Sequence, residues 1–266
     1  MSDILLAARN LSVRFGGVLA VNNVSFDVKR GEVFTMIGPN GAGKTTVFNL
    51  ISRIYTPTTG SIEYEGKMLI EQPPHRIASL GIARTFQNIE LFEYATVLQN
   101  LLIGRHIHRK TSLLSEVFFT GKVRQAEIDA REKVEKVIEF LDLQHHRDSM
   151  VAGLPYGVRK VVELARALCT EPKLLLLDEP SSGLNMEETD DMAFWIQDIR
   201  NDLGITVLMV EHDMTLVSKV SDRVLAMNMG EVLAMGTPRE VQNHPGVIEA
   251  YLGSVDDVND LRREAA

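Results

Sequence analysis

The chain has 266 residues, 45% of them hydrophobic and 24% charged, which suits one large α/β domain with a smaller appendage. Its formal net charge of −8 argues against a nucleic-acid-binding surface, and its single cysteine, Cys169, excludes an internal disulfide and fits a reducing cytoplasmic compartment. No apolar run reaches the length of a membrane span, and Met1–Leu5 lacks the pattern of a secretory signal, so we expect neither feature.

The first part of the chain alternates strand-like runs with turns. Gly16-Gly17 and Arg30-Gly31 mark two of these turns, because they interrupt the apolar pattern. The elements predicted here are strands over Leu5–Phe15, Val24–Val28 and Val33–Ile37, a helix from about Thr45 to Arg53, and a short strand over Ser61–Tyr64.

A glycine-rich segment joins the third strand to the first helix. It reads GPNGAGKTT and has the pattern G-x-x-x-x-G-K-[ST] of a phosphate-binding loop. Glycines let backbone N–H groups turn toward a phosphate chain, and the helix start adds its unpaired N–H groups. Lys44 is predicted to contact the β- and γ-phosphates of the ligand, and Thr45 to hold Mg²⁺. The residues predicted to bind the nucleotide here are Gly38, Pro39, Asn40, Gly41, Ala42, Gly43, Lys44, Thr45 and Thr46.

Helical patterns dominate the middle of the chain. Thr96 is a suitable N-cap for the first of these helices. Cys169 follows the last one and is expected to be a small buried residue rather than a redox group. The predicted helices are Val97–Ile103, Lys122–Leu143 and Gly157–Leu168, and Leu113–Phe119 is predicted as a short helix or loop.

A continuous apolar run, Lys173–Leu177, has the composition of a strand buried on both faces and ends in two carboxylates. Ligands of parallel α/β sheets bind beyond the carboxyl ends of the strands. Asp178 is therefore predicted to hold Mg²⁺ beside Thr45, and Glu179 to polarise the water that attacks the γ-phosphate. The alternative is a solvated pair of carboxylates at a strand end.

The remaining elements continue the alternation of strand and helix, which implies a mainly parallel sheet. They are a helix over Glu187–Leu203, a strand over Thr206–Val210, a hairpin of Arg223–Met229 and Glu231–Met235 that turns at Met229-Gly230, two short helices, and a frayed tail over 254–266.

With these motifs in place, the chain resembles the ATP-binding subunit of ABC transporters over nearly its whole length. The resemblance implies an α/β fold: a P-loop NTPase (RecA-like) core with a mainly parallel sheet, an N-terminal antiparallel β part and an inserted α-helical subdomain. It implies that Gln87 contacts Mg²⁺ or the attacking water, and that His212 contacts the γ-phosphate. Lys44 and Glu179 complete the predicted catalytic set. Phe15 is similar to the adenine-stacking aromatic of the family, although the same residue could belong to the core.

Two motifs depart from the family pattern. Leu154–Val158 reads LPYGV where the family has LSGGQ, so Pro155 brings neither the serine hydroxyl nor an N–H, and Val158 replaces the glutamine. Asn185 stands where the family has the D-loop aspartate. Because the family's signature motif serves the ATP of the opposite subunit, we hypothesise that the site completed by this chain's motif is the weaker one.

The chain also resembles, more narrowly, the branched-chain amino acid importers and the longer of their two ATPase subunits (the LivG-like branch). This resemblance rests on five segments: Gly81–Phe92, Thr96–Asn100, the insert over 104–125, Tyr156-Gly157 and the ending Pro245–Gly253. It implies a second ABC ATPase subunit, two transmembrane permease subunits and, indirectly, a periplasmic or extracellular substrate-binding protein, with no nucleic acid. It also implies a peripheral position on the cytoplasmic face of the inner membrane. Other amino acids, amides and urea stay open as substrates.

The resemblance divides the chain into a discontinuous ATP-binding core over 1–87 and 171–253, a helical subdomain over 88–170 and the tail. Ile89, Leu91 and Phe92 suit either a docking surface for a membrane subunit or ordinary subdomain core. Two other functions stay open: a soluble ABC ATPase that acts on nucleic acid or ribosomes, and a nucleotide-gated regulator with weak hydrolysis.

Overall fold

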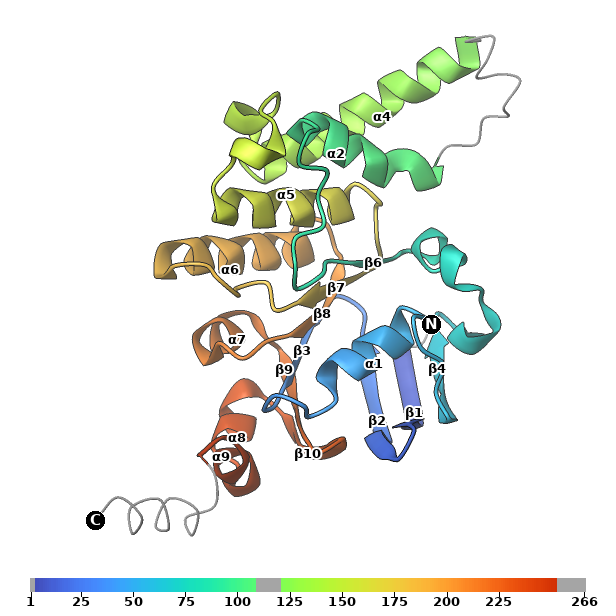
Figure 1. Cartoon of the computed structure of the whole chain (residues 1–266), viewed down its shortest axis with the longest axis vertical. Helices are drawn as coiled ribbons and strands as arrows, with labels where there is room; N and C mark the ends of the chain where they lie inside the picture. The colour runs from blue at the N-terminus through green and yellow to red at the C-terminus, as the bar shows by residue number, and fades with distance from the viewer. Residues whose placement is uncertain (1–2, 109–120, 253–266) are drawn as a thin grey trace.

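The computed structural model describes residues 3–108 and 121–252 and contains two β-sheets with helices between and around them (Figure 1). The first sheet is antiparallel and has the order β2 (Val18–Lys29), β1 (Ile4–Phe15), β4 (Thr59–Tyr64) and β5 (Lys67–Met68). The second has the order β10 (Glu231–Gly236), β9 (Arg223–Asn228), β3 (Val33–Ile37), β8 (Thr206–Val210), β7 (Leu174–Asp178) and β6 (Ile82–Arg84). Only β10 runs antiparallel to its neighbour in the second sheet.

The helices occupy three places in Figure 1. Between the two sheets lies α1 (Lys44–Ile51), whereas α5 (Tyr156–Leu168), α6 (Met186–Asn201) and α7 (Met214–Val220) lie on the other side of the second sheet. Farther out from the sheet are α2 (Val97–Gly104) and α4 (Gly121–Phe140), and α8 (Pro238–Gln242) and α9 (Pro245–Leu252) lie beside β10.

The apolar run of β7 is buried because both faces of the second sheet are covered. Leu174 and Leu176 join the core that contains α1 and the first sheet, whereas Leu175 and Leu177 join the core that contains α2, α4, α5 and α6. Successive side chains of a strand point to opposite faces, so one strand serves both cores. The hydrophobic run of β7 is therefore continuous because both faces of this central parallel strand are buried, as expected.

The predicted fold class is confirmed, although the bounds of some elements differ. β2 begins at Val18 rather than Val24, because Gly16-Gly17 forms a tight turn that lets the whole segment pair with β1. The short edge strand Ile82–Arg84 was not predicted, since three residues carry too little pattern. Predicted elements at Leu113–Phe119 and 254–266 lie outside the described residues.

Several local predictions are confirmed. Thr96 caps α2, its hydroxyl accepting the N–H of Gln99 at 3.2 Å. β9 and β10 are joined at Met229-Gly230. Cys169 is 1% exposed, and burial raises the pKa of its thiol to about 12, so the group stays protonated. The boundaries of the helical subdomain stay a prediction. None of the helices among the described residues is both long and apolar enough to cross a bilayer.

Candidate functional site

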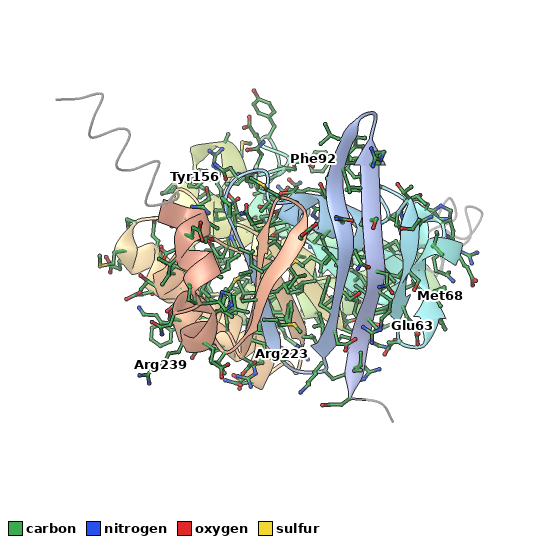
Figure 2. The ribbon with its side chains drawn as sticks, turned by 90° about the horizontal axis from the view of Figure 1, so that it is seen from below. Glu63, Met68, Phe92, Tyr156, Arg223 and Arg239 are labelled. Atoms are coloured by element: carbon green, nitrogen blue, oxygen red, sulfur yellow. The ribbon has the colours of Figure 1, made fainter. Side chains whose placement is uncertain are left out.

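Four parallel strands bring distant parts of the chain to one edge of the second sheet. β3, β6, β7 and β8 are neighbours in parallel register, so their carboxyl ends meet. The segments that follow these ends begin at Gly38, Thr85, Glu179 and Glu211. In Figure 2 the turn between β1 and β2 lies at the same edge of the molecule as the labelled Phe92 and Tyr156, opposite Arg223 and Arg239.

The predicted phosphate-binding loop leaves β3 and enters α1 at Lys44. Lys44 is 7% exposed, and its Nζ donates to the carbonyl oxygens of Gly38 at 2.5 Å and Pro39 at 3.0 Å. Burial lowers the pKa of Lys44, and the negative charges of Glu179 and Asp178 oppose this shift. The ammonium group is therefore held within electrostatic reach of both carboxylates.

The outer side of the loop rests on the turn between β9 and β10. The N–H of Gly230 donates to the carbonyl of Ala42 at 3.1 Å, and the carbonyl of Gly230 accepts from the N–H of Asn22 at 2.8 Å. These bonds connect the loop to the β9–β10 turn, and that turn to β2. Asn40 and Gly41 are exposed, so this part of the loop faces solvent.

Glu179 meets two other predicted catalytic residues. The side-chain amide of Gln87 donates to Glu179 Oε2 at 2.8 Å, and His212 Nδ1 lies 3.9 Å from the same oxygen. Glu179 has φ of 51°, a left-handed conformation that is uncommon for residues other than glycine. Strained backbone of this kind concentrates at functional sites. The structure thus brings Gln87, Glu179 and His212 together; their catalytic roles stay predictions.

Asp178 is buried at the end of β7 and paired with Arg84. Arg84 Nη2 lies 2.7 Å from Asp178 Oδ2, and the two side chains are 8% and 5% exposed. The carboxylate of Asp178 and the hydroxyl of Thr45 are hard oxygen donors, the kind that Mg²⁺ prefers together with phosphate oxygens and water. The residues present therefore fit a magnesium ion that arrives with a nucleotide.

Three charged residues at this edge were not predicted as site residues. Arg84 also donates to Asn49 Oδ1 at 2.8 Å, and its guanidinium lies over the rings of Phe48 and Phe86. Lys160 Nζ donates to the carbonyls of Gln87 at 3.2 Å and Glu179 at 3.4 Å.

Glu211, which is fully buried, is the third of these residues. Its carboxylate accepts the N–H groups of Ser181 at 2.9 Å, His212 at 2.8 Å and Asp213 at 3.1 Å. Arg84 and Glu211 could have been predicted from the sequence, because each is a charged residue next to a strand-end motif. The sequence offered no such sign for Lys160, which lies inside a helix.

Phe15 is 44% exposed at the end of β1 and packs edge-to-face against Tyr55, with 5.0 Å between ring centroids. Tyr55 was not predicted to be part of this surface. Exposed aromatic rings supply the flat apolar surface that a purine base stacks on. This exposure argues against the alternative that Phe15 belongs to the hydrophobic core. The adenine-binding role of Phe15 stays a prediction.

Within the segment Ile89–Phe92, one residue fits the subdomain core and another fits a docking surface. Leu91 packs against the core that contains α2 and α5, whereas Phe92 is 59% exposed. The N–H of Phe92 donates to Asn100 Oδ1 at 2.9 Å, which fixes the backbone and leaves the ring outside. Phe92 and its neighbour Tyr94, also exposed, suit a docking surface.

The unusual signature segment begins α5. Pro155 is the N-cap residue and gives no side-chain hydrogen bond to the helix. Tyr156 donates its hydroxyl to the carbonyl of Ser182 at 3.3 Å. Asn185 caps α6, its Oδ1 accepting the N–H of Glu188 at 3.0 Å. The D-loop position therefore has a local structural role.

Comparison with known proteins agrees with this arrangement. A family model described as ABC transporter matches residues 21–182, and a second, described as branched-chain amino acid ATP-binding cassette transporter, matches residues 231–257. The chain is 44% identical over 253 residues to the high-affinity branched-chain amino acid transport ATP-binding protein LivG of Salmonella typhimurium, covering 95% of this chain and 99% of that protein. It has the same identity and coverage with BraF of Pseudomonas aeruginosa, which carries the same description.

Solved structures give the same result. An ATP-binding cassette of an ABC transporter in its ADP conformation superimposes with a TM-score of 0.83 at 33% identity, covering 95% of this chain and all of that chain. A nucleotide-free ATP-binding cassette superimposes with a TM-score of 0.82, also at 33% identity, over 94% of this chain and all of that chain.

Proposed function

The chain belongs to the ABC transporter family, as an ATP-hydrolysing ABC ATPase, and we propose that it drives an importer of branched-chain amino acids. The proposed substrate class rests on the relatives LivG and BraF and on the match of residues 231–257 to a branched-chain amino acid transporter model. Family members of this type work with membrane permeases.

We place the triphosphate of ATP in the loop from Gly38 to Thr46. The backbone N–H groups of the loop and the start of α1 bind the phosphates, and Lys44 neutralises their charge. Thr45 and Asp178 hold Mg²⁺, which supplies further positive charge next to the transferred phosphoryl group. Phe15 and Tyr55 hold the adenine by stacking.

One observation carries the hydrolytic mechanism: Gln87, Glu179 and His212 converge beside the buried Lys44. Glu179 polarises a water molecule and accepts its proton as the water attacks the γ-phosphate. The amide of Gln87 orients this carboxylate, and His212 donates toward the γ-phosphate from the end of β8. Family members complete each site with a partner subunit, so the isolated chain hydrolyses ATP slowly.

The assembly that fits this role contains a second ATPase subunit, two permease subunits and a substrate-binding protein. It places the chain at the cytoplasmic face of the membrane. Phe92 and Tyr94 form the exposed apolar surface on which a permease segment docks.

The test is phosphate release by the reconstituted transporter with Glu179→Gln in this chain. We expect a loss of about 100-fold or more, because the variant keeps a similar shape and removes the general base. Glu63→Gln, an exposed glutamate labelled in Figure 2 away from the site edge, is the matched control. Unchanged phosphate release by the Glu179 variant would remove this residue from the base role. A wild-type assembly that binds ATP without hydrolysing it would instead favour a nucleotide-gated regulator.

The transported class is tested separately with the same assembly. Leucine, isoleucine and valine, each presented with the binding protein, should stimulate phosphate release, whereas an amide and urea should not. Stimulation by urea alone would assign the subunit to a different importer of the same branch.

A further inference from the structure

The first residue of the phosphate-binding loop is held by a side chain from the other end of the protein. The N–H of Gly38 donates to the hydroxyl oxygen of Tyr251 at 2.7 Å, although 213 positions separate the two residues. Gly38 is buried, and we find no second acceptor for this N–H among the described residues. A buried N–H without a partner is unfavourable, so the phenol satisfies a real requirement of the loop.

Gly38 has little freedom to find another partner. Its φ is 149°, and a Cβ atom at this position would lie 2.2 Å from the carbonyl oxygen of Met227. The chain therefore passes so close to β9 that only glycine fits. At the same time the carbonyl of Gly38 accepts a hydrogen bond from Lys44 Nζ. Tyr251 and Lys44 thus hold the N–H and the carbonyl of one residue.

The helix that carries Tyr251 is anchored next to the loop. Val247 of α9 and Val241 of α8 are 4% and 1% exposed, and they form a separate small core with Ile37, the residue before Gly38. Figure 1 shows α8 and α9 at the end of the sheet where the loop between β3 and α1 lies. Helix α9 is therefore fixed on the same strand end that it contacts through its tyrosine.

We propose that Tyr251 is a positioning residue of the nucleotide site: its hydroxyl fixes the entrance of the phosphate-binding loop and makes the C-terminal helix a structural part of that site. The inference rests on the phosphate-binding role proposed for the loop. When ATP draws Lys44 away from the carbonyl of Gly38, the bond from Tyr251 keeps this residue in place. A loop without this bond must be ordered by the nucleotide itself, which weakens binding.

The experiment uses the purified full-length chain and compares Tyr251→Phe with the wild type. The affinity for Mg-ATP is measured by titration calorimetry, and the Gly38 amide is followed by ¹H–¹⁵N NMR. Loss of one neutral hydrogen bond should weaken Mg-ATP binding about fivefold and move the Gly38 amide resonance. In steady state KM should rise while kcat changes little, a split that a general loss of folded protein would not produce.

Two controls sharpen the result. Ser79→Ala also removes one hydroxyl group, at an exposed residue outside the loop and α9, and should leave the affinity unchanged. Val247→Ala keeps the hydroxyl but loosens the anchor of α9, and it should also weaken Mg-ATP binding. Wild-type affinity in Tyr251→Phe, at any melting temperature, would overturn the proposal. Lys44→Ala tests the phosphate-binding role of the loop separately from the role of Tyr251. If Mg-ATP binding survived this substitution, the phosphate-binding role of the loop would be refuted.

Discussion

At the scale of single residues, the site depends on buried charges that neutralise one another. Arg84 and Asp178 are the clearest pair, because the side chains are almost completely removed from solvent. Asn49 and Ser52 accept further hydrogen bonds from the guanidinium of Arg84, at 2.8 Å and 3.1 Å. Breaking a buried pair on one side leaves an uncompensated charge, which costs more than the pair itself contributes.

Arg84→Ala should therefore destabilise the nucleotide-free protein by about 3–5 kcal/mol, measured by urea unfolding. Arg9→Ala is the control, because Arg9 and Asp27 form an ion pair with side chains 47% and 34% exposed, for which we expect about 0–1 kcal/mol.

The two members of the buried pair should also be coupled. A double-mutant cycle of Arg84→Ala and Asp178→Asn should give a coupling free energy of about 1 kcal/mol or more. Additive effects would contradict the interpretation that the two side chains act as a pair.

At the scale of elements, the start of α5 is locked onto the loop before α6. Gly183 has φ of 81°, and a Cβ atom there would lie 2.7 Å from the ring of Tyr156. The same tyrosine donates its hydroxyl to the carbonyl of Ser182. The signature segment and the D-loop segment of one chain thus form a single contact. We expect a substitution in the signature segment to alter the conformation of the D-loop segment, and the reverse.

Gly183→Ala should destabilise the protein more than Gly204→Ala in urea unfolding. Both glycines have positive φ, 81° and 64°, but a Cβ atom at Gly204 would meet nothing within 4 Å. Gly204→Ala should cost about 1–2 kcal/mol from backbone conformation alone. Gly183→Ala should add about 1 kcal/mol or more, because the tyrosine ring must move and lose its hydrogen bond. Equal effects would show that Tyr156 moves aside freely.

At the scale of the whole molecule, the chain carries the full predicted phosphate-binding loop and an altered signature segment. Pro155 and Tyr156 are exposed at the start of α5, and Figure 2 shows Tyr156 at the edge of the molecule that carries Phe92. The helix start keeps its unpaired N–H groups and its dipole, but Pro155 gives it no hydroxyl. The asymmetry between the two sites of an assembled dimer stays a prediction.

Pro155→Ser should raise phosphate release by the assembled transporter, because it restores a hydroxyl that faces the partner's nucleotide in this interpretation. The same substitution should stabilise the isolated chain by about 0.5–2 kcal/mol, since serine is a good N-cap. Pro73→Ser, at the start of a short helix outside the site, is the matched control. Higher stability without faster phosphate release would refute the weak-site hypothesis.

The sequence alone was enough for those features that depend on neighbouring residues. The glycine pattern before Lys44, the apolar run that ends in Asp178 and the mainly parallel sheet follow from local periodicity and loop chemistry, and strand-end logic then placed Glu179 and His212 at one edge. The antiparallel β part and the helical subdomain were implied by the family resemblance. The tertiary structure decided which distant side chains meet: Arg84 on Asp178, Lys160 between two loops and Tyr251 on Gly38. These contacts have no local pattern because they depend on the order of the strands and on the packing of α5 and α9, which only the folded chain fixes.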